Sequence, residues 1–353
     1  MALPLDRESM RVFRRTILAL PIISLASAAC TPSDGLPPAK EVAAGSTVAT
    51  EQVILATAFD PSMRPYELSG PLVPATTSMI SAWDIPDDPL RDPSLDGSPD
   101  GERVRWGYRL FANTPAEAPR LTTGGMSCGN CHLNAGQREL ALPLVGSAGM
   151  FPEYNRRAGR DFSLEDRIVG CFMRSENATE GVPHDGEMDE LPAGRVVPTP
   201  QTEEVVALAA YIRWLSRAHE PGDSPRWRKQ NRIPEDALIP VEQLDPQRGE
   251  MLFLQHCAPC HGEDGQGVQI GDKKAGPLWG PRSWNDGAGA ARVYTLAGMI
   301  RYMMPYLNPG VLTDEEAQQI AAFITSKPRP AYPYKDQDYL TEPPPVDAVY
   351  YRR

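Results

Sequence analysis

The sequence lacks an excess of positive charge, and its N-terminal apolar run is short. Its 35 lysines and arginines are outnumbered by 46 aspartates and glutamates, which gives a formal net charge of -11 at pH 7. This balance argues against nucleic acid and favours a soluble partner that is neutral or carries basic patches. The apolar run, residues 17–25, is too short to cross a bilayer as a helix.

Cysteine and histidine are also scarce, with six and five copies among 353 residues. Most of them nevertheless fall into two short motifs, CGNCH at residues 128–132 and CAPCH at residues 257–261. Cys-x-x-Cys-His signals covalent haem attachment, because two thiols one turn apart form thioethers with the porphyrin vinyls while the adjacent imidazole binds the iron. The motifs therefore predict two covalently bound haem c groups, attached through Cys128, Cys131, Cys257 and Cys260 and ligated by His132 and His261.

Residues 1–30 have the pattern of an export signal. Arg11, Arg14 and Arg15 precede the apolar run, and the small residues 26–29 that follow it suit a signal peptidase. Haem c is attached outside the cytoplasm, which agrees with this interpretation. We therefore predict a signal peptide over residues 1–30, a tether over residues 31–78 and a periplasmic protein.

Cys30 belongs to neither haem motif. An unpaired thiol in an oxidising compartment can interfere with haem attachment, so it must be removed or used. Its position after Ala28 and Ala29, before a stretch that contains Pro and Gly, resembles a bacterial lipoprotein, in which this cysteine becomes the acylated N-terminus. The alternative is cleavage after Ala28 or Ala29, which leaves a soluble periplasmic protein.

The length and the periodicity predict a mainly α fold of two cytochrome c-like haem domains joined by a linker. Helices are expected over residues 103–113, from Thr199 onward with that threonine as N-cap, and after a capping box of Thr313 and Glu316. Residues 84–101, rich in Pro, Asp and Gly, are expected to form an arm or loop. The predicted domains are 79–220 with the catalytic haem, the linker 221–240, 241–327 with the electron-transfer haem, and a Pro/Tyr-rich tail 328–353.

Each haem iron needs a second axial ligand or an open position. In the second domain Met303, Met304 and Pro305 follow His261 at the distance where small cytochromes commonly bring a methionine over the haem. Met304 is the preferred ligand and Met303 the alternative. His/Met ligation raises the reduction potential and suits electron delivery.

For the first haem the candidate ligands are Met150, Met173, His184 and Cys171. Cys171 is accompanied by an arginine cluster, while no lysine occurs between Lys40 and Lys229. Arginines near a thiol favour the thiolate, which is both a nucleophile and an iron ligand, and their planar guanidinium groups bind oxyanions. The cluster consists of Arg156, Arg157, Arg160, Arg167 and Arg174.

Several longer stretches carry a family resemblance. The runs GMSCGNCHLNAG, GMFPEYNRRAG, LEDRIVGCFMRS and PLWGPRSWNDGAG, with the Met-Met-Pro that follows, resemble the periplasmic dihaem thiosulfate dehydrogenases, which interconvert thiosulfate and tetrathionate. The resemblance covers about residues 100–350. It implies that His132 and Cys171 ligate the first haem and His261 and a methionine the second, and that the substrate site is lined by Arg157, Arg167 and Ser175.

The resemblance also implies a reaction. Two thiosulfates would be joined through their outer sulfurs and two electrons released, with Arg157 and Arg167 binding the sulfonate ends and Cys171 as nucleophile and labile iron ligand. Electrons would pass to the second haem and on to a cytochrome acceptor. The chain departs from the family pattern at Val169, at residues 176–180 and at Met303, where some relatives have a lysine that exchanges with methionine.

Three other functions stay open from the sequence. One is a dihaem electron-transfer cytochrome without its own substrate, in which Cys171 only tunes a potential. Another is a sulfur-oxidising cytochrome that acts on carrier-bound thiosulfate. The third is a dihaem peroxidase, which the scarcity of spare histidines disfavours, since the sequence offers only His184, His219 and His256.

Overall fold

The structure is a computed structural model of the chain and describes residues 85–122, 125–179, 196–270 and 273–351. These residues all belong to one compact unit, residues 60–353. The predicted signal peptide, Cys30, the tether, the first residues of the predicted first domain and His184 lie outside the described residues.

The described part of the chain is mainly helical, as predicted. Its α-helices are α2 (Pro99–Ala112), α3 (Thr114–Glu117), α4 (Cys128–Cys131), α5 (Leu133–Gly136), α6 (Leu164–Arg174), α7 (Glu203–Leu215), α8 (Pro246–His256), α9 (Ala258–His261), α10 (Val293–Met303) and α11 (Asp314–Ser326). Short 3-10 helices are η1 (Pro93–Leu95), η2 (Pro119–Leu121), η3 (Ser147–Met150), η5 (Glu235–Ala237), η6 (Val241–Gln243), η7 (Gly289–Ala291), η8 (Lys335–Gln337) and η9 (Val349–Tyr351). Two antiparallel hairpins pair β1 (Glu153–Asn155) with β2 (Arg160–Phe162) and β3 (Gln269–Ile270) with β4 (Lys273–Lys274).

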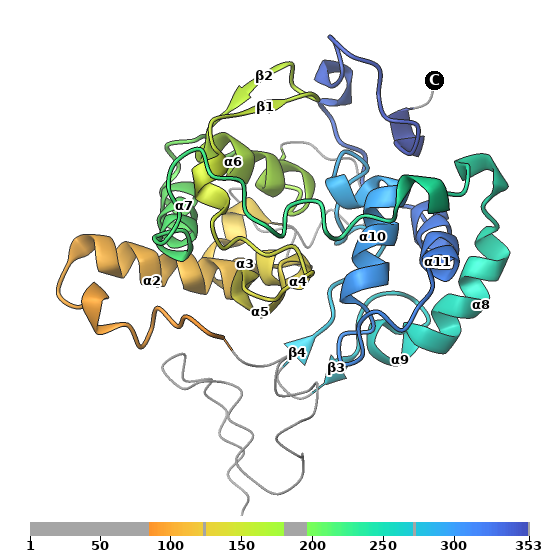
Figure 1. Cartoon of the computed structure of the whole chain (residues 1–353), viewed down its shortest axis with the longest axis horizontal. Helices are drawn as coiled ribbons and strands as arrows, with labels where there is room; N and C mark the ends of the chain where they lie inside the picture. The colour runs from red at the N-terminus through yellow and green to blue at the C-terminus, as the bar shows by residue number, and fades with distance from the viewer. Residues whose placement is uncertain (1–84, 123–124, 180–195, 271–272, 352–353) are drawn as a thin grey trace, which may run out of the picture. The chain divides into compact units, whose positions relative to one another are not determined.

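Two pairs of helices pack closely together, α2 with α7 and α8 with α11 (Figure 1). Each crossing has a glycine where the backbones are closest. A Cβ on Gly107 would lie 2.1 Å from the carbonyl oxygen of Ala207, and one on Gly249 would lie 2.1 Å from that of Gln319. Because no other residue fits so close to a neighbouring backbone, the two glycines permit the two crossings.

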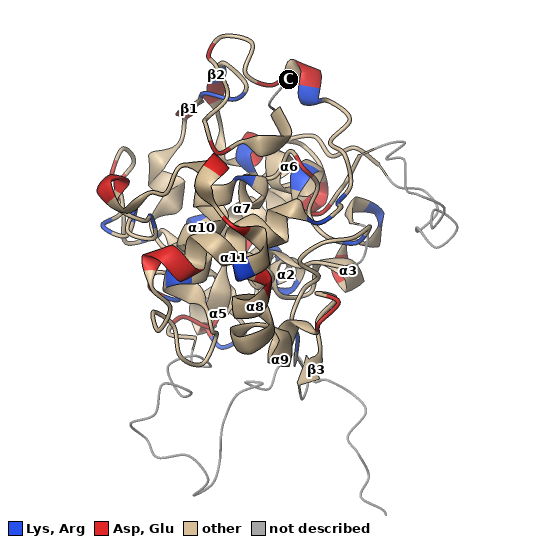
Figure 2. Cartoon of the chain, turned by 90° about the vertical axis from the view of Figure 1, so that its right-hand side faces the viewer, with Lys and Arg blue, Asp and Glu red and all other residues tan. Residues whose placement is uncertain are grey.

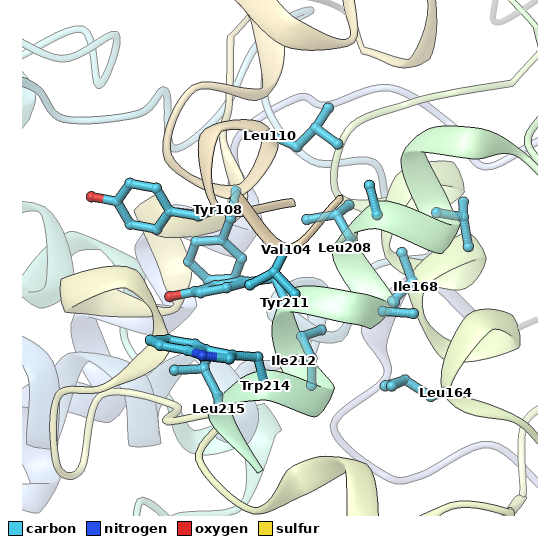
Figure 3. Packing of buried hydrophobic residues seen from close by; sticks show 14 of the residues in the cluster. Val104, Tyr108, Leu110, Leu164, Ile168, Leu208, Tyr211, Ile212, Trp214 and Leu215 are labelled. Atoms are coloured by element: carbon cyan, nitrogen blue, oxygen red, sulfur yellow. The ribbon is translucent and has the colours of Figure 1, made fainter. Parts of the chain in front are cut away.

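The first hydrophobic core is built around α7, as Figure 3 shows. The ring of Tyr211 lies 5.7 Å from that of Tyr108 in a T-shaped contact and 6.1 Å from that of Trp214 in a stacked one. The Tyr211 hydroxyl donates a hydrogen bond of 2.7 Å to the carbonyl of Ala135, just beyond the first haem motif. Aromatic burial thus stabilises the helix crossing and anchors the motif loop to it.

The second core lies between α8, α10 and α11. The rings of Phe253, Trp279 and Phe323 contact one another with centroids 5.3 to 5.7 Å apart. At the start of α11 the Glu316 amide donates to the Thr313 hydroxyl at 3.2 Å and the Thr313 amide donates to the Glu316 carboxylate at 2.8 Å. The predicted capping box is therefore confirmed.

Two helix starts differ from the predictions. The helix expected from Thr199 begins at Glu203, because residues 199–201 form a turn in which the Thr199 amide donates to the hydroxyl of Thr202, the actual N-cap, at 2.8 Å. Residues 84–101 are not all loop, since α2 already begins at Pro99. Ser98 caps it by accepting a hydrogen bond of 2.9 Å from Gly101 N, and proline suits the first helical position.

The C-terminal segment is packed into the protein. Asp347, Ala348 and Tyr332 are only 1%, 2% and 6% exposed. Among the described residues no helix is long and apolar enough to cross a membrane. The boundaries of the two haem domains stay predictions.

Candidate active site

The first haem motif forms α4, a single helical turn. The amide of Ser127, its N-cap, donates to the side-chain oxygen of Asn130 at 2.7 Å. This turn brings Cys128 and Cys131 to one place, and both thiols are buried deeply enough that the pKa of Cys131 is raised to about 12 and that of Cys128 further still. The described cysteines form no disulfide, so the four motif thiols are free to attach haem.

His132 is oriented for a metal by the loop that follows it. Its Nδ1 lies 2.6 Å from the carbonyl oxygen of Leu142, and because a carbonyl only accepts, Nδ1 carries the proton and Nε2 is left for the iron. Leu142 has a left-handed backbone, with φ of 50°, which directs its carbonyl at the ring. Burial lowers the pKa of His132, and the positive charge of Arg167 lowers it further, so the imidazole is in its neutral, ligating form.

Cys171 lies near the haem-attachment pair. It sits in the last turn of α6, which a capping box of Ser163 and Asp166 starts, and its side chain is half-buried. Ile168 and Phe172 of the same helix belong to the buried cluster against which Cys128 packs, so α6 and the attachment turn share one core, and the charge of Cys171 would raise the pKa of both Cys128 and Cys131. The chain therefore brings together a histidine ready for iron, two attachment thiols and a third thiol, a donor set that fits a covalently bound haem with a thiol nearby.

Glu176 is a member of this site that the sequence did not identify as such. Residues 176–180 were noted only as a departure from the family pattern, yet the Glu176 side chain is 3% exposed and accepts a hydrogen bond of 3.0 Å from the Thr122 hydroxyl. Its charge would raise the pKa of both Cys128 and Cys131. Burial raises the pKa of Glu176 itself to about 7, although the bond from Thr122 opposes the shift.

The raised pKa predicts a pH-dependent stability. Below 4.5, the ordinary pKa of a glutamate, Glu176 is protonated in both the folded and unfolded states. As the pH rises to about 7, the unfolded state releases this proton first, so about 3 kcal/mol of stability is lost. Relative to wild type, Glu176→Gln should therefore gain about 3 kcal/mol in free energy of unfolding between pH 4 and pH 8, measured by denaturant titration.

The control for this experiment is Glu203→Gln, at an exposed position in the first turn of α7. Its effect on the free energy of unfolding should differ between the two pH values by less than about 1 kcal/mol, because an exposed charge in the first turn of a helix contributes no more than that. The explanation is wrong if Glu176→Gln shows the same stability difference from wild type at pH 4 and at pH 8.

The five arginines of the predicted cluster separate into two groups. Charged residues of both signs lie next to each other around β1, β2 and α6 (Figure 2). Arg156 pairs with Glu342 at 2.5 Å and Arg160 with Asp166 at 2.9 Å, both on the surface. The side chain of Arg167 is exposed and has no hydrogen-bond or ion-pair partner within the described parts of the chain, so its guanidinium is available to an anion, and its charge acts on His132.

Arg157 and Arg174 converge on one backbone carbonyl instead. The Nη1 atoms of Arg157 and Arg174 donate to the Gly287 oxygen at 2.5 and 3.1 Å. Arg174 also makes two hydrogen bonds, of 2.8 and 2.7 Å, to the carboxylate of Asp338, while the Arg157 guanidinium lies 5.7 Å from the ring centroid of Tyr339. The C-terminal segment therefore holds these two arginines, a role that residue spacing did not indicate.

Ser175 is next to this group. It is half-buried at the C-cap of α6, and its amide donates to the Cys171 carbonyl at 2.7 Å. The structure thus brings Ser175, Cys171 and Arg174 together at one helix end, whereas Arg157 contacts Gly287 and Tyr339. Of the two predicted anion-binding arginines, Arg167 is the one near His132.

The second haem motif has the same chemistry. Cys257 is half-buried with its pKa raised by burial to about 12, Cys260 is exposed, and burial lowers the pKa of His261. Met303 is 1% exposed and ends α10, and Met304 follows it as a half-buried, extended C-cap. The choice between the two methionines as axial ligand stays a prediction.

Comparisons with known proteins identify the family. Residues 244–324 match the family model described as cytochrome c oxidase, cbb3-type, subunit III. The chain is 36% identical over 239 residues to thiosulfate dehydrogenase from Allochromatium vinosum, covering 66% of this chain and 80% of the relative, and 32% identical over 246 residues to that from Stutzerimonas stutzeri, covering 69% and 73%. The solved thiosulfate dehydrogenase (TsdBA) from Marichromatium purpuratum is similar with a TM-score of 0.59 and 32% identity, over 77% of this chain and 55% of that one. The resemblance and the mainly α cytochrome fold are confirmed, and the chain belongs to the thiosulfate dehydrogenase family of c-type cytochromes.

Proposed function

We propose that this chain is a dihaem c-type cytochrome that oxidises two thiosulfates to tetrathionate, reversibly, and passes the electrons to a cytochrome acceptor. The observation that carries the proposal is the third thiol, Cys171, on a helix that packs into the same core as Cys128 and that also carries Arg167, whose side chain is exposed and has no ion-pair partner among the described residues. A cytochrome that only transfers electrons has no need of a thiol and a free guanidinium at its iron ligand. The relatives, which are named thiosulfate dehydrogenases, support the same reaction.

The proposed chemistry balances with Cys171 as nucleophile. Its thiolate and the outer sulfur of one thiosulfate form an S–S bond, which releases two electrons and leaves a cysteine S-sulfonate persulfide. The outer sulfur of a second thiosulfate then attacks that adduct, releasing tetrathionate and restoring the thiolate. Splitting the reaction into two steps lowers its barrier. Each haem, when bound, accepts one electron.

The remaining residues act by position and charge. Arg167 binds a sulfonate and offsets the repulsion between two dianions, while Arg157 and Ser175 line the site as the family resemblance implies. Cys128 and Cys131 would hold the first haem, and His132 and Cys171 would supply its iron ligands. Cys257 and Cys260 would hold the second haem, with His261 and Met304 as its iron ligands.

The direct test is an assay with the purified holoprotein. Reduction of ferricyanide should depend on thiosulfate and yield tetrathionate, and tetrathionate should be reduced when an electron donor is supplied. A protein that exchanges electrons with a cytochrome but shows no thiosulfate-dependent reduction would instead be the electron-transfer cytochrome, and turnover with peroxide alone would indicate a peroxidase.

Arg167 supplies a prediction for substrate binding. Arg167→Gln removes a charge-assisted bond to a sulfonate and should raise the KM for thiosulfate about 10-fold, since such a bond contributes about 1.5–3 kcal/mol. Arg160→Gln is the matched control, because Arg160 is exposed and already paired with Asp166. Steady-state assays would contradict the role of Arg167 if the two variants had the same KM.

Export and anchoring complete the proposal. Residues 1–30 direct the chain to the periplasm, and acylation of Cys30 tethers it to a membrane surface. Cells grown with radioactive fatty acid should yield labelled wild-type protein, and Cys30→Ser should carry no label. An unlabelled wild-type protein means cleavage after Ala28 or Ala29 and no anchor.

A further inference from the structure

The loop after the first haem motif contacts the predicted ligand loop of the second haem. Leu133 and Ala141 belong to one buried cluster with Met303, which is the last residue of α10. Met304 and Leu142 pack against the same cluster, and the carbonyl of Leu142 is the one that orients His132. The proximal side of one haem site therefore adjoins the methionine side of the other.

Arg138 makes the polar part of this contact. Its Nη2 donates to the carbonyl of Tyr306 at 2.9 Å, and its guanidinium lies over the Tyr306 ring, 4.9 Å from the centroid. The Tyr306 hydroxyl donates in return to the side-chain oxygen of Asn134 at 3.2 Å. Tyr306 is two residues from Met304, so a carbonyl, a ring and a hydroxyl of the methionine loop are all bound by the histidine loop.

Arg138 occupies a position where burying its charged side chain costs free energy, which would not be expected of a residue with only a packing role. Its side chain is half-buried, and its buried Nη1 has no hydrogen-bond partner among the described residues. Burying such a group costs free energy that the Tyr306 contacts must offset. Its loop also has left-handed backbones at Asn134 and Leu140, which adds to the constraint.

We propose that Arg138, with Asn134, is a positioning residue that holds the Met304 loop over the second haem and thereby raises that haem's reduction potential. The inference rests on the proposed axial role of Met304. A thioether ligand is weak, and a loop fixed in place loses less entropy when its sulfur binds. Because methionine ligation raises the potential, releasing the loop should lower it.

The experiment compares variants of the holoprotein by absorption spectroscopy and redox titration. Arg138→Leu should lose at least half of the methionine-to-iron charge-transfer band and shift the reduction equilibrium of the second haem at least tenfold, which is about 59 mV for one electron. Tyr306→Phe removes only the hydrogen bond from the hydroxyl to Asn134. It should weaken the band and lower the potential of the second haem, each by less than Arg138→Leu does. Arg138→Lys should recover part of the band.

The matched control is Arg217→Leu. Arg217 makes the same kind of contact, with Nη1 donating to the Trp214 carbonyl at 2.9 Å and the guanidinium 4.4 Å from the centroid of the indole, but it binds α7 and Asp87 and not the methionine loop. An unchanged band and potential in Arg138→Leu, an equal effect of Arg217→Leu, or a wild-type protein without the band would each overturn the inference. A wild-type holoprotein that does not oxidise thiosulfate, while Arg138→Leu still weakens the band and lowers the potential, would refute the proposed function alone.

Discussion

Replacing Cys171 with glycine is expected to lower kcat for thiosulfate oxidation at least about 10³-fold, which corresponds to about 4 kcal/mol of transition-state stabilisation. The nucleophile that carries the sulfur adduct is removed, so the reaction has to proceed in one difficult step. Both haems should remain, because their covalent bonds are made by Cys128, Cys131, Cys257 and Cys260. Haem staining after denaturing electrophoresis checks attachment, and thiosulfate-dependent ferricyanide reduction checks turnover.

The loss of activity has to be separated from loss of an iron ligand and from unfolding. Cys171→Met keeps a sulfur that can ligate iron but has no nucleophilic thiolate, and it should be as inactive as the glycine variant. A glycine inside α6 costs about 1 kcal/mol of stability, too little to explain a 10³-fold effect. If Cys171→Met retained turnover, Cys171 would be a ligand that tunes a potential and not the nucleophile.

The sequence predicted the chemistry of the site better than its surroundings. The haem motifs, Cys171 and Arg167 were found because thiol spacing and local charge are properties of short stretches of chain. Glu176 was singled out only as part of a departure from the family pattern, because its burial and its hydrogen bond from Thr122, 54 residues away, cannot be known from either segment alone. The Leu142 carbonyl that orients His132 was also missed, because a left-handed backbone at a leucine has no sequence signal.

The fold shows the same limit. The capping box at Thr313 was predictable because both of its partners lie within one helical turn. The start of α7 was wrong by three residues, since Thr199 and Thr202 are equally good caps and a turn selects the second. The hairpin around Arg157 contacts Gly287 and Tyr339, which both lie more than 100 residues further along the chain. The packing of the C-terminal segment depends on the same long-range contacts, so neither feature could be predicted from a short stretch of sequence.

Removing the carboxylate of Asp338 is expected to destabilise the protein by about 3–5 kcal/mol. Asp338 and Arg174 form a buried ion pair, with side chains 5% and 15% exposed, and Asp338 also accepts a hydrogen bond of 2.5 Å from the Tyr351 hydroxyl. Asp338→Leu leaves the Arg174 charge buried without its partner. Denaturant unfolding of the holoprotein measures the loss, and because Arg174 ends the helix of Cys171, turnover should fall with it.

A double-mutant cycle tests whether the unpaired charge is the cause. Arg174→Leu combined with Asp338→Leu should recover most of the stability, since replacing both members of a buried pair by apolar residues is often neutral. The pair of Arg156 and Glu342 joins the same two parts of the chain, but Arg156 is 68% exposed, so Glu342→Gln should cost less than about 1 kcal/mol. Additive losses in the cycle, or equal losses for Asp338→Leu and Glu342→Gln, would show that the C-terminal segment is held by its apolar contacts and not by Arg174.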